Sequence, residues 1–520
     1  MLYSIRQFAK LARICRVMAK HDALFLVQEL GVAPIAVFFA KRFSWRKAEG
    51  TKGQRLVRAF QELGPTFIKL GQALSVRSDL VGEDIARELA ELQDNVPPFH
   101  FSQVKDVIEA EFGKSLEDLF SEFDPKPVAA ASIAQVHFAT TLAGEEVAVK
   151  ILRPNVEKAF SRDIELFYWI AHSVERAMPK FRRLKPVEVV HNFEETVILE
   201  MDLRMEASAA AELQGNMADD PDIKVPLVTW QLTSQQVLTL ERVHGVEIDD
   251  QNALESAGHD VKEVMRKAAT IFFNQVYRDG FFHADMHPGN LFVADDGRII
   301  VIDFGIMGRV KRQTRVHLAQ MLLGFLNRDY RKVADVHFDA GYIPSHKSRA
   351  TFAQACRSIG EPIFELPQNE ISLARLLSQL YKVSEEFEME TQPQLLLLQK
   401  TMVLAEGLGR TLDPNANFWE LARPLVAEWG RKNLGPEARV RAAVDDLRSV
   451  GDRVHNLLEA VEVLPTVISK DGIRLHPATI DHFARGRGGR KSGIFKVVAV
   501  SAIAASITTL IVVYILSKIM

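Results

Sequence analysis

The sequence predicts an α+β fold of two lobes, with a helical extension before it and a transmembrane helix after it. Three observations lead to this prediction. Residues 127–152 alternate as a strand hairpin does and include Lys150, residues 283–305 carry two acidic loop motifs, and residues 497–516 hold no charge. The expected parts are a helical extension over 1–125, a small lobe over 126–245, a helix-rich large lobe over 246–470, a basic glycine-rich linker over 471–496 and a transmembrane helix over 497–516.

Composition sets the broad class of the protein. With 520 residues, of which 47% are apolar and 25% charged, the chain can bury a large core and is long enough for more than one unit. A net charge of -3 gives no global positive field, so nucleic acid is not an expected partner. The two cysteines, Cys15 and Cys356, are far apart and give neither a disulfide framework nor a repeated metal-ligand spacing. A reducing, cytosol-facing compartment fits best.

The first 125 residues are predicted to be helical, because apolar positions recur at helical spacing and strand signals are few. At the start, basic residues recur every three or four positions with no acid before Asp22. They are Arg6, Lys10, Arg13, Arg16 and Lys20. Such a helix can lie on an anionic bilayer or be an ordinary surface helix, and the sequence leaves both open.

Strand and helix patterns alternate through the middle of the chain. The hairpin over 127–152 is broken at Leu142-Ala143-Gly144-Glu145. A helical region over 156–215, short strands over 221–241, a helix over 261–282 and a helix-rich region over 312–460 follow. We expect a hinge after the last of the short strands, where an adenine ring could bond to backbone groups near Glu241 and Val243.

The most specific motif lies in the middle of the chain, within the predicted large lobe. It reads His283-Ala284-Asp285-Met286-His287-Pro288-Gly289-Asn290, followed by Ile302-Asp303-Phe304-Gly305. An Asp at the position of Asp285 can receive or orient a proton, while Asn290 and Asp303 can hold Mg²⁺ against the phosphates of ATP. The order of these residues therefore predicts magnesium-dependent phosphoryl transfer.

A lysine upstream strengthens this prediction. Val147-Ala148-Val149-Lys150 has the pattern of a buried strand that ends in the lysine with which kinases grip the α- and β-phosphates. Taken alone, Lys150 would more often be an ordinary surface lysine. Alternation of His283, Asp285 and His287 could also indicate a metal-dependent hydrolase, but no further His-rich ligand set follows. We expect His283 to bond the backbone near the metal-binding turn, and His287 has no assigned role.

The hairpin that would cover the ATP phosphates lacks the usual glycines. We assign nucleotide binding to Ala129, Ala130, Ala131, Ser132, Ile133, Ala134, Gln135 and Val136. Alanine restricts φ and adds methyl groups where glycine would let backbone amides approach closely. We therefore expect altered phosphate cradling and a changed nucleotide preference.

Taken together, several motifs resemble one family. They are Lys69-x-Gly71-Gln72, the alanine-rich hairpin, Val-Ala-Val-Lys, Glu200-x-Asp202 with Glu206, the His-x-Asp-x-His-Pro-Gly-Asn loop and Asp-Phe-Gly. Over residues 20–460 the chain resembles the UbiB/ADCK family of atypical kinases, and its C-terminal span resembles the bacterial UbiB members. The resemblance implies a protein-kinase-like fold and a role in ubiquinone biosynthesis at the membrane.

The resemblance also implies roles for the residues that match. Lys150 would contact the α- and β-phosphates of ATP and pair with Glu206. Asp285 would take the catalytic-loop role, while Asn290 and Asp303 would bind Mg²⁺.

Residues of the extension would regulate this site. Lys69 would lie over it against Glu200 or Asp202, with Gln72 nearby, and the extension would cover the surface where a protein substrate docks. If Asp202 and Glu206 shared one helix they would repel mildly, unless Lys69 or Mg²⁺ lay between them.

The C-terminal run predicts a membrane anchor. Its twenty uncharged residues, 497–516, can cross a hydrocarbon core of about 30 Å. Five basic residues precede it, namely Arg485, Arg487, Arg490, Lys491 and Lys496, against only Lys518 beyond it. This asymmetry predicts that the catalytic part faces the cytoplasm. The resemblance to bacterial UbiB members implies that the membrane is the bacterial inner membrane. A buried soluble helix is the alternative, and small residues in the run leave a homodimer open.

The predicted protein is thus a membrane-anchored atypical kinase or ATPase with ATP and Mg²⁺ as cofactors, supporting ubiquinone biosynthesis. Expected partners are membrane lipids or isoprenoid quinone precursors and other quinone-biosynthesis proteins. Two alternatives stay open: a protein kinase acting in trans, and a nucleotide-gated scaffold or lipid-extraction chaperone. Phosphorylation of a small molecule also stays open, because antibiotic and choline phosphotransferases have similar loops.

Overall fold

The computed structural model divides the chain into two units, Met1–Leu434 and Gly435–Met520. The described residues are 2–23, 25, 50–75, 81–90, 92, 97–177, 186–364, 379, 383, 386–389, 393–413, 418–434, 468–469 and 472–473. In the second unit they form one antiparallel strand pair, β12 (Ile468–Ser469) with β13 (Gly472–Ile473). All other elements described below belong to the first unit.

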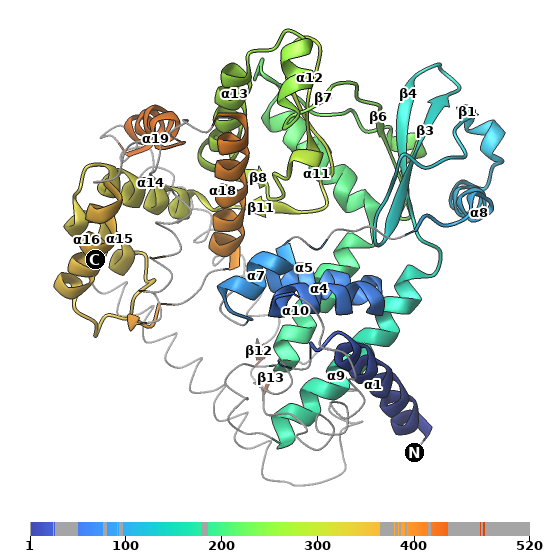
Figure 1. The fold of residues 1–520 in the computed structure, drawn as a ribbon, viewed down its shortest axis with the longest axis horizontal. Coiled ribbons are helices and arrows are strands. Elements are labelled where there is room, and N and C mark those ends of the chain that lie inside the picture. The colour runs from blue at the N-terminus through green and yellow to red at the C-terminus, as the bar shows by residue number, and fades with distance from the viewer. Residues whose placement is uncertain are drawn as a thin grey trace. The chain divides into compact units, whose positions relative to one another are not determined.

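A five-stranded antiparallel sheet forms the small lobe (Figure 1). Its strands are β1 (Phe120–Phe123), β2 (Ala129–Ala130), β3 (Ala134–Thr141), β4 (Glu146–Leu152) and β6 (Val237–Glu241). The order is β1-β3-β4-β6, with β2 paired to β3. In β4 the buried residues Val149 and Ile151 pack toward helix α8 (Phe101–Phe112). Because side chains alternate along a strand, Lys150 lies on the opposite face of the sheet.

On that second face α11 (Leu203–Asn216) packs against β6. Helix α10 (Pro186–Glu200) packs against α11 and against α9 (Val156–Ala177). Helix α11 starts at Asp202, whose side chain accepts a hydrogen bond from the backbone N–H of Arg204. Its buried stripe contains Leu203, Glu206 and Ala207. The period of 3.6 residues therefore turns Glu206 inward, toward the sheet.

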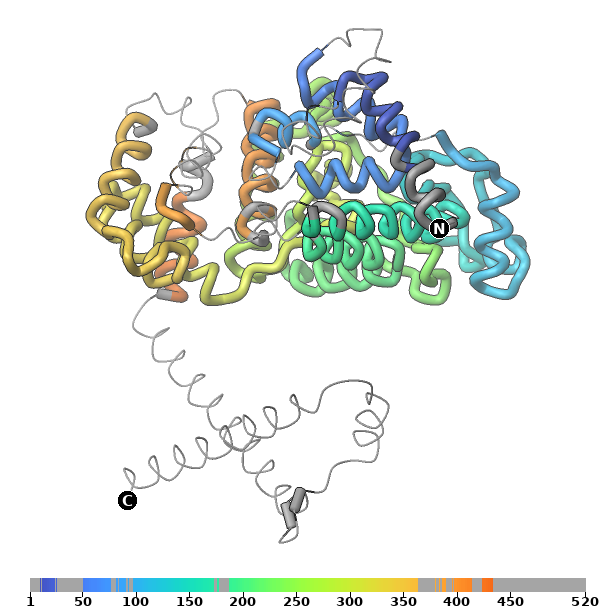
Figure 2. The backbone as a smooth tube through the Cα atoms, turned by 90° about the horizontal axis from the view of Figure 1, so that it is seen from below, coloured from blue at the N-terminus to red at the C-terminus, as the bar shows by residue number. Residues whose placement is uncertain are grey.

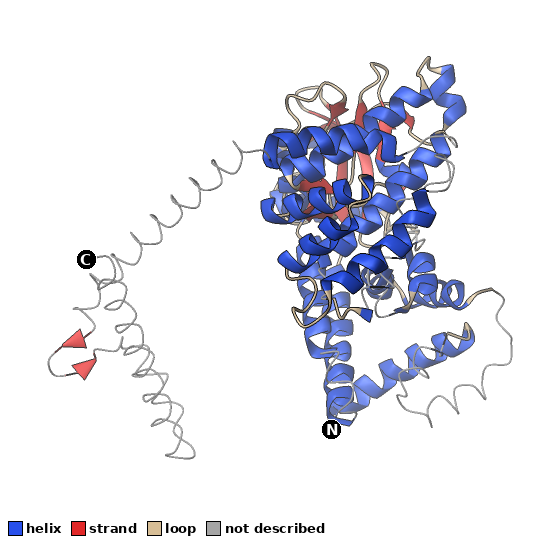
Figure 3. Ribbon diagram, turned by 90° about the vertical axis from the view of Figure 1, so that its left-hand side faces the viewer, coloured by secondary structure: helices blue, strands red, loops and turns tan. Residues whose placement is uncertain are grey.

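The large lobe has two small sheets and a helical shell. One sheet has the order β5 (Ile223–Lys224), β10 (Ile299–Val301), β9 (Leu291–Val293) and β7 (Val246–Glu247), and the other pairs β8 (Phe281–His283) with β11 (Met307–Arg309). The helices are α12 (Gln251–Ser256), α13 (Val261–Phe273), a π-helix (Asn274–Asp279), α14 (Arg312–Leu326), α15 (Tyr330–Asp339), α16 (Arg349–Phe364), α18 (Pro393–Leu412) and α19 (Phe418–Leu434). Figure 3 shows helices surrounding the strands.

Two boundaries differ from the predicted ones. The small-lobe sheet begins at Phe120 rather than after residue 125, because Val104 and Ile108 of α8 pack on the face of the sheet. In the other direction, Leu213 and Ile223 lie within the predicted small lobe but pack in the large-lobe core. Parallel pairing of β5 with β10 attaches the segment that contains Ile223 to the large lobe.

The N-terminal extension is helical, with α1 (Leu2–Lys20), α4 (Lys52–Leu63), α5 (Pro65–Ser75) and α7 (Glu83–Ala90). These helices share a core of their own that includes Leu56, Phe60 and Ile68. Figure 2 shows the blue helices lying along the teal and green α9 and α10. The Thr66 hydroxyl donates a 2.7 Å hydrogen bond to Asp163 on α9, which joins the extension to the small lobe.

The predicted membrane segment lies outside the described residues and stays a prediction. In the part of the chain that the structure describes, no helix has both the length and the apolar character needed to cross a bilayer. The basic amphipathic pattern at the start of the chain does form a helix, α1. Its last turn is buried in the extension's core through Val17 and Met18, and Lys20 pairs with Glu62 at 2.8 Å.

Candidate active site

Lys150 and Glu206 form an ion pair between the small-lobe sheet and α11. Lys150 Nζ lies 2.8 Å from Glu206 Oε1 and 3.0 Å from Oε2. The two side chains are 19% and 8% exposed. Removing one member of such a pair leaves an uncompensated buried charge, at a cost of about 3–5 kcal/mol for fully buried pairs. The pairing implied by the family resemblance is thus present as a direct contact.

Asp303 reaches the same lysine from the large lobe. Its Oδ1 atom lies 3.3 Å from Lys150 Nζ and accepts a hydrogen bond from Gly305 N. The backbone of Asp303 has φ of 60°, in the left-handed region that Asp tolerates better than bulky residues do. This turn directs the carboxylate toward the small lobe, where 51% of the side chain stays exposed.

Electrostatics keep this cluster charged. The positive charge of Lys150 lowers the pKa of Asp303 to about 2, so that its carboxylate is ionised at neutral pH. Burial disfavours the Lys150 ammonium, but the charges of Asp303 and Glu206 outweigh burial and raise its pKa. Burial raises the pKa of Glu206, and the charge of Lys150 acts against that shift.

His283 ties the two acidic loops together. It is fully buried at the end of β8, where its Nδ1 atom accepts a 3.3 Å hydrogen bond from the backbone N–H of Asp285. Its Nε2 atom must therefore carry the proton, which it donates to the carbonyl of Asp303 at 2.7 Å. The predicted backbone role of His283 is confirmed. Among the described residues, no group of three or more His, Cys, Asp or Glu side chains is placed to hold a metal, as the alternative hydrolase would require.

Asn290 holds the Asp285 loop closed. Its Nδ2 atom donates to both the backbone carbonyl and the Oδ2 atom of Asp285, each at 3.1 Å. Because the amide nitrogen is used in this way, the amide oxygen is the atom that remains for a cation. His287 caps the same turn, since its Nδ1 atom accepts from the backbone N–H of Gly289 at 3.2 Å.

The alanine-rich segment is a β2–β3 hairpin, but its side chains divide between two faces of the sheet. Val136 lies directly across from Lys150, so both side chains project from the same face. Gln135 lies on the other face, where its side chain bonds the backbone of Phe99 and the ring of His137. Strand alternation thus turns the Gln135 side chain away from Lys150, which leaves only its backbone for the predicted contact with the nucleotide.

Hydrogen bonds from Arg153 fix the tip of the hairpin. Arg153 donates to the carbonyl of Ala131 from its side chain and to the carbonyl of Ile133 from its backbone. Ser132 is fully buried, and its hydroxyl makes no hydrogen bond within the described part of the chain. These contacts hold the alanine-rich turn in one shape without glycine.

Lys69 pairs with Glu200, and Asp202 has a different role. Lys69 Nζ lies 2.8 Å from Glu200 Oε2, and the side chains are 12% and 16% exposed. Asp202 instead caps α11 and pairs with Arg204, whose hydrogen bond lowers the pKa of Asp202. The expected repulsion between Asp202 and Glu206 on one helix was wrong, because Asp202 precedes the helix rather than lying in it.

Lys69 also acts on the site at a distance. After the larger effect of Lys150, its charge adds to the lowering of the pKa of Asp303. At Glu206 burial raises the pKa, and the charge of Lys69 acts against that shift together with Lys150. Gln72 lies one turn further along α5 and is half-buried. The extension thus brings a second cation close to the carboxylates that surround Lys150.

Two domain families match the chain. The ABC1 atypical kinase-like domain covers residues 91–337, and the UbiB helical domain covers residues 356–417. A protein named "Probable protein kinase UbiB" from Marinobacter nauticus is 42% identical over 448 residues, which are 85% of this chain and 82% of that protein. This chain belongs to the UbiB family. Its recognition from sequence motifs is confirmed.

A second relative and a solved structure are also similar to this chain. The protein of the same name from Azotobacter vinelandii is 43% identical over 82% of this chain and 79% of its own length. A solved complex of Rv3197 with erythromycin from Mycobacterium tuberculosis is 26% identical, with a TM-score of 0.48, and covers 70% of this chain and 93% of that one. As a UbiB-family protein, the chain is an atypical kinase-like protein of a family named for ubiquinone biosynthesis, and its fold is kinase-like and of mixed α and β structure.

The donor set of this UbiB-family site fits Mg²⁺ with a nucleotide. Mg²⁺ prefers oxygen ligands and usually takes one or two from protein side chains, with the rest from phosphates and water. Asp303 supplies an ionised carboxylate, and Asn290 supplies an amide oxygen. Lys150 adds a cation on the small-lobe side, as phosphate binding requires.

Sequence reasoning missed one residue that supports this UbiB-family site. Gln275 is fully buried in the π-helix before β8, and its Oε1 atom accepts a 2.8 Å hydrogen bond from the backbone N–H of His283. π-Helical turns are rare and often occur at functional sites. Nothing in the local sequence marks Gln275, because its partner depends on how the chain turns at Gly280.

Proposed function

We propose that this chain binds Mg²⁺-ATP in the cleft around Lys150 and turns it over as an atypical kinase or ATPase, in support of ubiquinone biosynthesis. One observation carries the proposal. Lys150 Nζ lies between the carboxylates of Glu206 and Asp303, at 2.8 and 3.3 Å, so that a single cation faces both lobes. Kinase-type phosphoryl transfer depends on such a lysine between the helix carboxylate and the metal-binding Asp.

Each side chain would have a defined task. Glu206 would hold Lys150 against the α- and β-phosphates, and Asn290 and Asp303 would hold Mg²⁺ through oxygen atoms. Bound Mg²⁺ supplies charge neutralisation at the phosphate oxygens. Asp285, held by Asn290, would orient the attacking hydroxyl or water and accept its proton.

The location of the enzyme is part of the proposal. The uncharged run over 497–516 would anchor the chain in the bacterial inner membrane, with its basic flank on the cytoplasmic side. Isoprenoid quinone precursors and the other quinone-biosynthesis proteins would then be within reach of the cytoplasmic cleft.

Calorimetry with the full-length protein in detergent tests nucleotide binding. We expect Mg²⁺-dependent ATP binding by the wild type, and at least a tenfold weaker affinity for Lys150→Met, because a charge-assisted phosphate contact contributes about 1.5–3 kcal/mol. EDTA should weaken binding by the wild type as well. Lys332→Met, an exposed lysine on α15, is the matched control and should bind as the wild type does. Wild-type protein that is folded but takes up no nucleotide would refute the proposal.

The names of the relatives favour one competing function, protein kinase activity. Transfer of radiolabel from ATP to proteins of a membrane extract, lost in Lys150→Met, would support it. Release of phosphate without labelled protein would support the ATPase.

In cells, the proposal predicts that Asp303→Asn accumulates an early prenylated quinone precursor, which mass spectrometry can detect. The reason is that the variant lacks the charged ligand needed for turnover. Normal quinone levels with a variant that binds ATP but does not turn it over would favour a nucleotide-gated scaffold or lipid-extraction chaperone instead.

A further inference from the structure

Helix α18 is in direct contact with the loop that carries Asp285. It belongs to the UbiB helical domain match, residues 356–417, and packs against α13 and β11 of the large lobe (Figure 1). More than one hundred residues of chain separate it from the loop. None of the tasks proposed above for the nucleotide site uses a residue of α18.

The first contact is a buried hydrogen bond. Thr401 on α18 is fully buried, and its hydroxyl oxygen lies 3.2 Å from the carbonyl oxygen of Ala284 and 2.9 Å from that of Leu397. The hydroxyl has one proton, which these two carbonyls share. Ala284 is also fully buried, so this contact provides its carbonyl with a donor across the interface.

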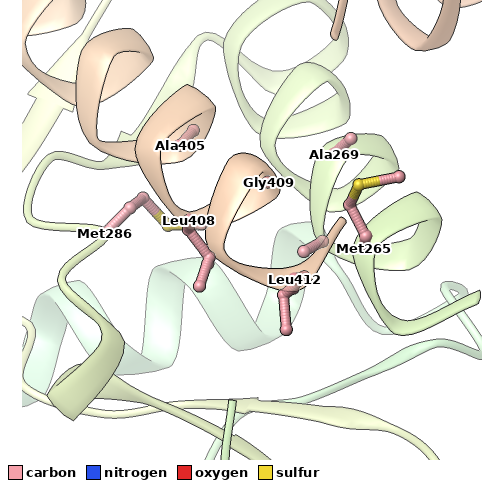
Figure 4. Close-up of a pocket in the computed structure, with 8 residues that line it drawn as sticks. Met265, Ala269, Met286, Ala405, Leu408, Gly409 and Leu412 are labelled. Atoms are coloured by element: carbon pink, nitrogen blue, oxygen red, sulfur yellow. The ribbon is translucent and has the colours of Figure 1, made fainter. Parts of the chain in front are cut away.

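The second contact is apolar. Met286 is 2% exposed and lines a small pocket of about 10 Å³ with Ala405, Leu408 and Gly409 of α18 (Figure 4). Met265 of α13 closes the other side. The lining of this pocket is apolar, which disfavours a bound water molecule. The Met286 side chain is therefore buried against α18.

Asp285 lies between these two anchored neighbours. Ala284 is held by Thr401 through its carbonyl, Met286 is held by the pocket, and the Asp285 amide is held by His283. Consecutive residues share peptide planes, so fixing both neighbours restricts the backbone from which the Asp285 carboxylate extends.

We propose that Thr401 and Met286 are positioning residues. Through the contacts of these two residues, α18 sets where the Asp285 carboxylate lies relative to the reacting phosphate. The inference rests on the proposed function. In this arrangement the helical domain supplies no group to the nucleotide and acts only on the orientation of Asp285. Losing the contact should then slow the chemical step and leave nucleotide affinity nearly unchanged, because Lys150, Asn290 and Asp303 are untouched.

The test compares Thr401→Val, which keeps the shape and removes the hydroxyl, with Thr401→Ser, which restores it. Thr411→Val is the matched control, because the exposed Thr411 hydroxyl bonds only the carbonyl of Gly407 in its own helix. We expect Thr401→Val to lower kcat about tenfold, since small misplacements of a catalytic group cost one to two orders of magnitude. The KM for ATP and the calorimetric Kd should stay within about twofold of wild type. Thr401→Ser should recover most of the rate.

Amide hydrogen exchange supplies a readout that does not depend on turnover. Exchange of the peptide covering 281–290 should be faster in Thr401→Val than in Thr411→Val, while peptides of β3 and β4 stay unchanged. If the wild type hydrolyses no ATP, the proposed function fails, and the exchange comparison alone still decides the inference. Equal exchange and equal kcat in Thr401→Val and Thr411→Val would overturn it, and so would loss of nucleotide affinity in step with kcat.

Filling the pocket tests the second contact. A Cβ atom at Gly409 would lie 3.9 Å from Met265 Sδ, an ordinary contact, whereas one at Gly407 would meet nothing within 4 Å. Both substitutions by alanine favour the helix equally. The added methyl group at Gly409 contacts Met265 of α13 and no atom of Met286 within 4 Å, so it strengthens the packing of α18 on α13. If that packing restrains the loop, Gly409→Ala should slow exchange in 281–290 more than Gly407→Ala does. Equal effects would show that the packing of α18 on α13 does not restrain the loop.

Discussion

Replacement of Asp303 by asparagine should lower Mg²⁺-dependent ATP turnover by about a thousandfold, the upper range for losing one preorganised charged contact. The substitution keeps the shape and the oxygen that accepts from Gly305 N. It removes the charge that Lys150 holds ionised, with its pKa at about 2. A neutral amide is a much poorer Mg²⁺ ligand than a carboxylate. Phosphate release by purified protein, measured over a range of Mg²⁺ concentrations, checks the result.

Controls separate this loss from misfolding. Asp295→Asn makes the same chemical change in the exposed turn before β10 and should leave turnover unchanged. The thermal midpoint of Asp303→Asn should stay close to that of wild type, because the Asp303 side chain is half exposed and its ion pair is screened by water. Turnover by Asp303→Asn at the wild-type rate would remove Asp303 from the metal site.

Motif order pointed to the residues of the proposed nucleotide site, among which the structure joins Lys150 with Asp303 and Asp285 with Asn290. Lys150 lies within β4, Asp285 and Asp303 follow β8 and β10, and Asn290 ends the short turn before β9. The types and spacing of these residues reflect the chemistry directly. The structure brings Lys150 and Asp303 within 3.3 Å across 153 residues. The spacing of the motifs in the sequence could not predict that distance, because it depends on how the two lobes pack against each other.

Predictions failed where the face or the end of an element mattered. Gln135 was assigned to the nucleotide because it lies in the hairpin, but the alternation that places Val136 beside Lys150 turns Gln135 away. Asp202 lies in the region over 156–215 that was predicted to be helical, but the helix is interrupted there between α10 and α11. Asp202 is the N-cap residue of α11, a position that Asp prefers. That preference was a local signal, and it could have corrected the assignment.

Contacts between distant elements had no local signal at all. Thr401 and Ala284 are 117 residues apart. The α18 sequence does not show that the Thr401 hydroxyl reaches the carbonyl of Ala284. Thr401 and Thr411 differ in what faces them, which is set by the packing of α18 on the large lobe. Sequence periodicity predicted a helix-rich region there, but packing decides which side chains reach the catalytic loop.

Glycine at position 308 should be required for stability, and Gly308→Ala should cost about 3 kcal/mol, at the upper end for overpacking a core. Gly308 on β11 is directly opposite Phe282 on β8. A Cβ atom at Gly308 would lie 2.1 Å from Phe282 Cζ and 2.3 Å from Cε1. Phe282 is fully buried and cannot swing aside into solvent. Either the ring or the β8–β11 pair must move.

The same movement should reduce activity, because Phe282 precedes His283, which holds the loops of Asp285 and Asp303. Thermal and urea unfolding should show the loss of stability, and ATP turnover the loss of alignment. Gly215→Ala is the matched control: Gly215 lies in α11, and a Cβ atom there meets nothing within 4 Å. That control should gain up to about 1 kcal/mol from helix propensity. If Gly308→Ala unfolded at the wild-type midpoint with full activity, the β8–β11 pair would tolerate the added methyl group. The alignment of the two acidic loops could then not depend on close packing between Gly308 and Phe282.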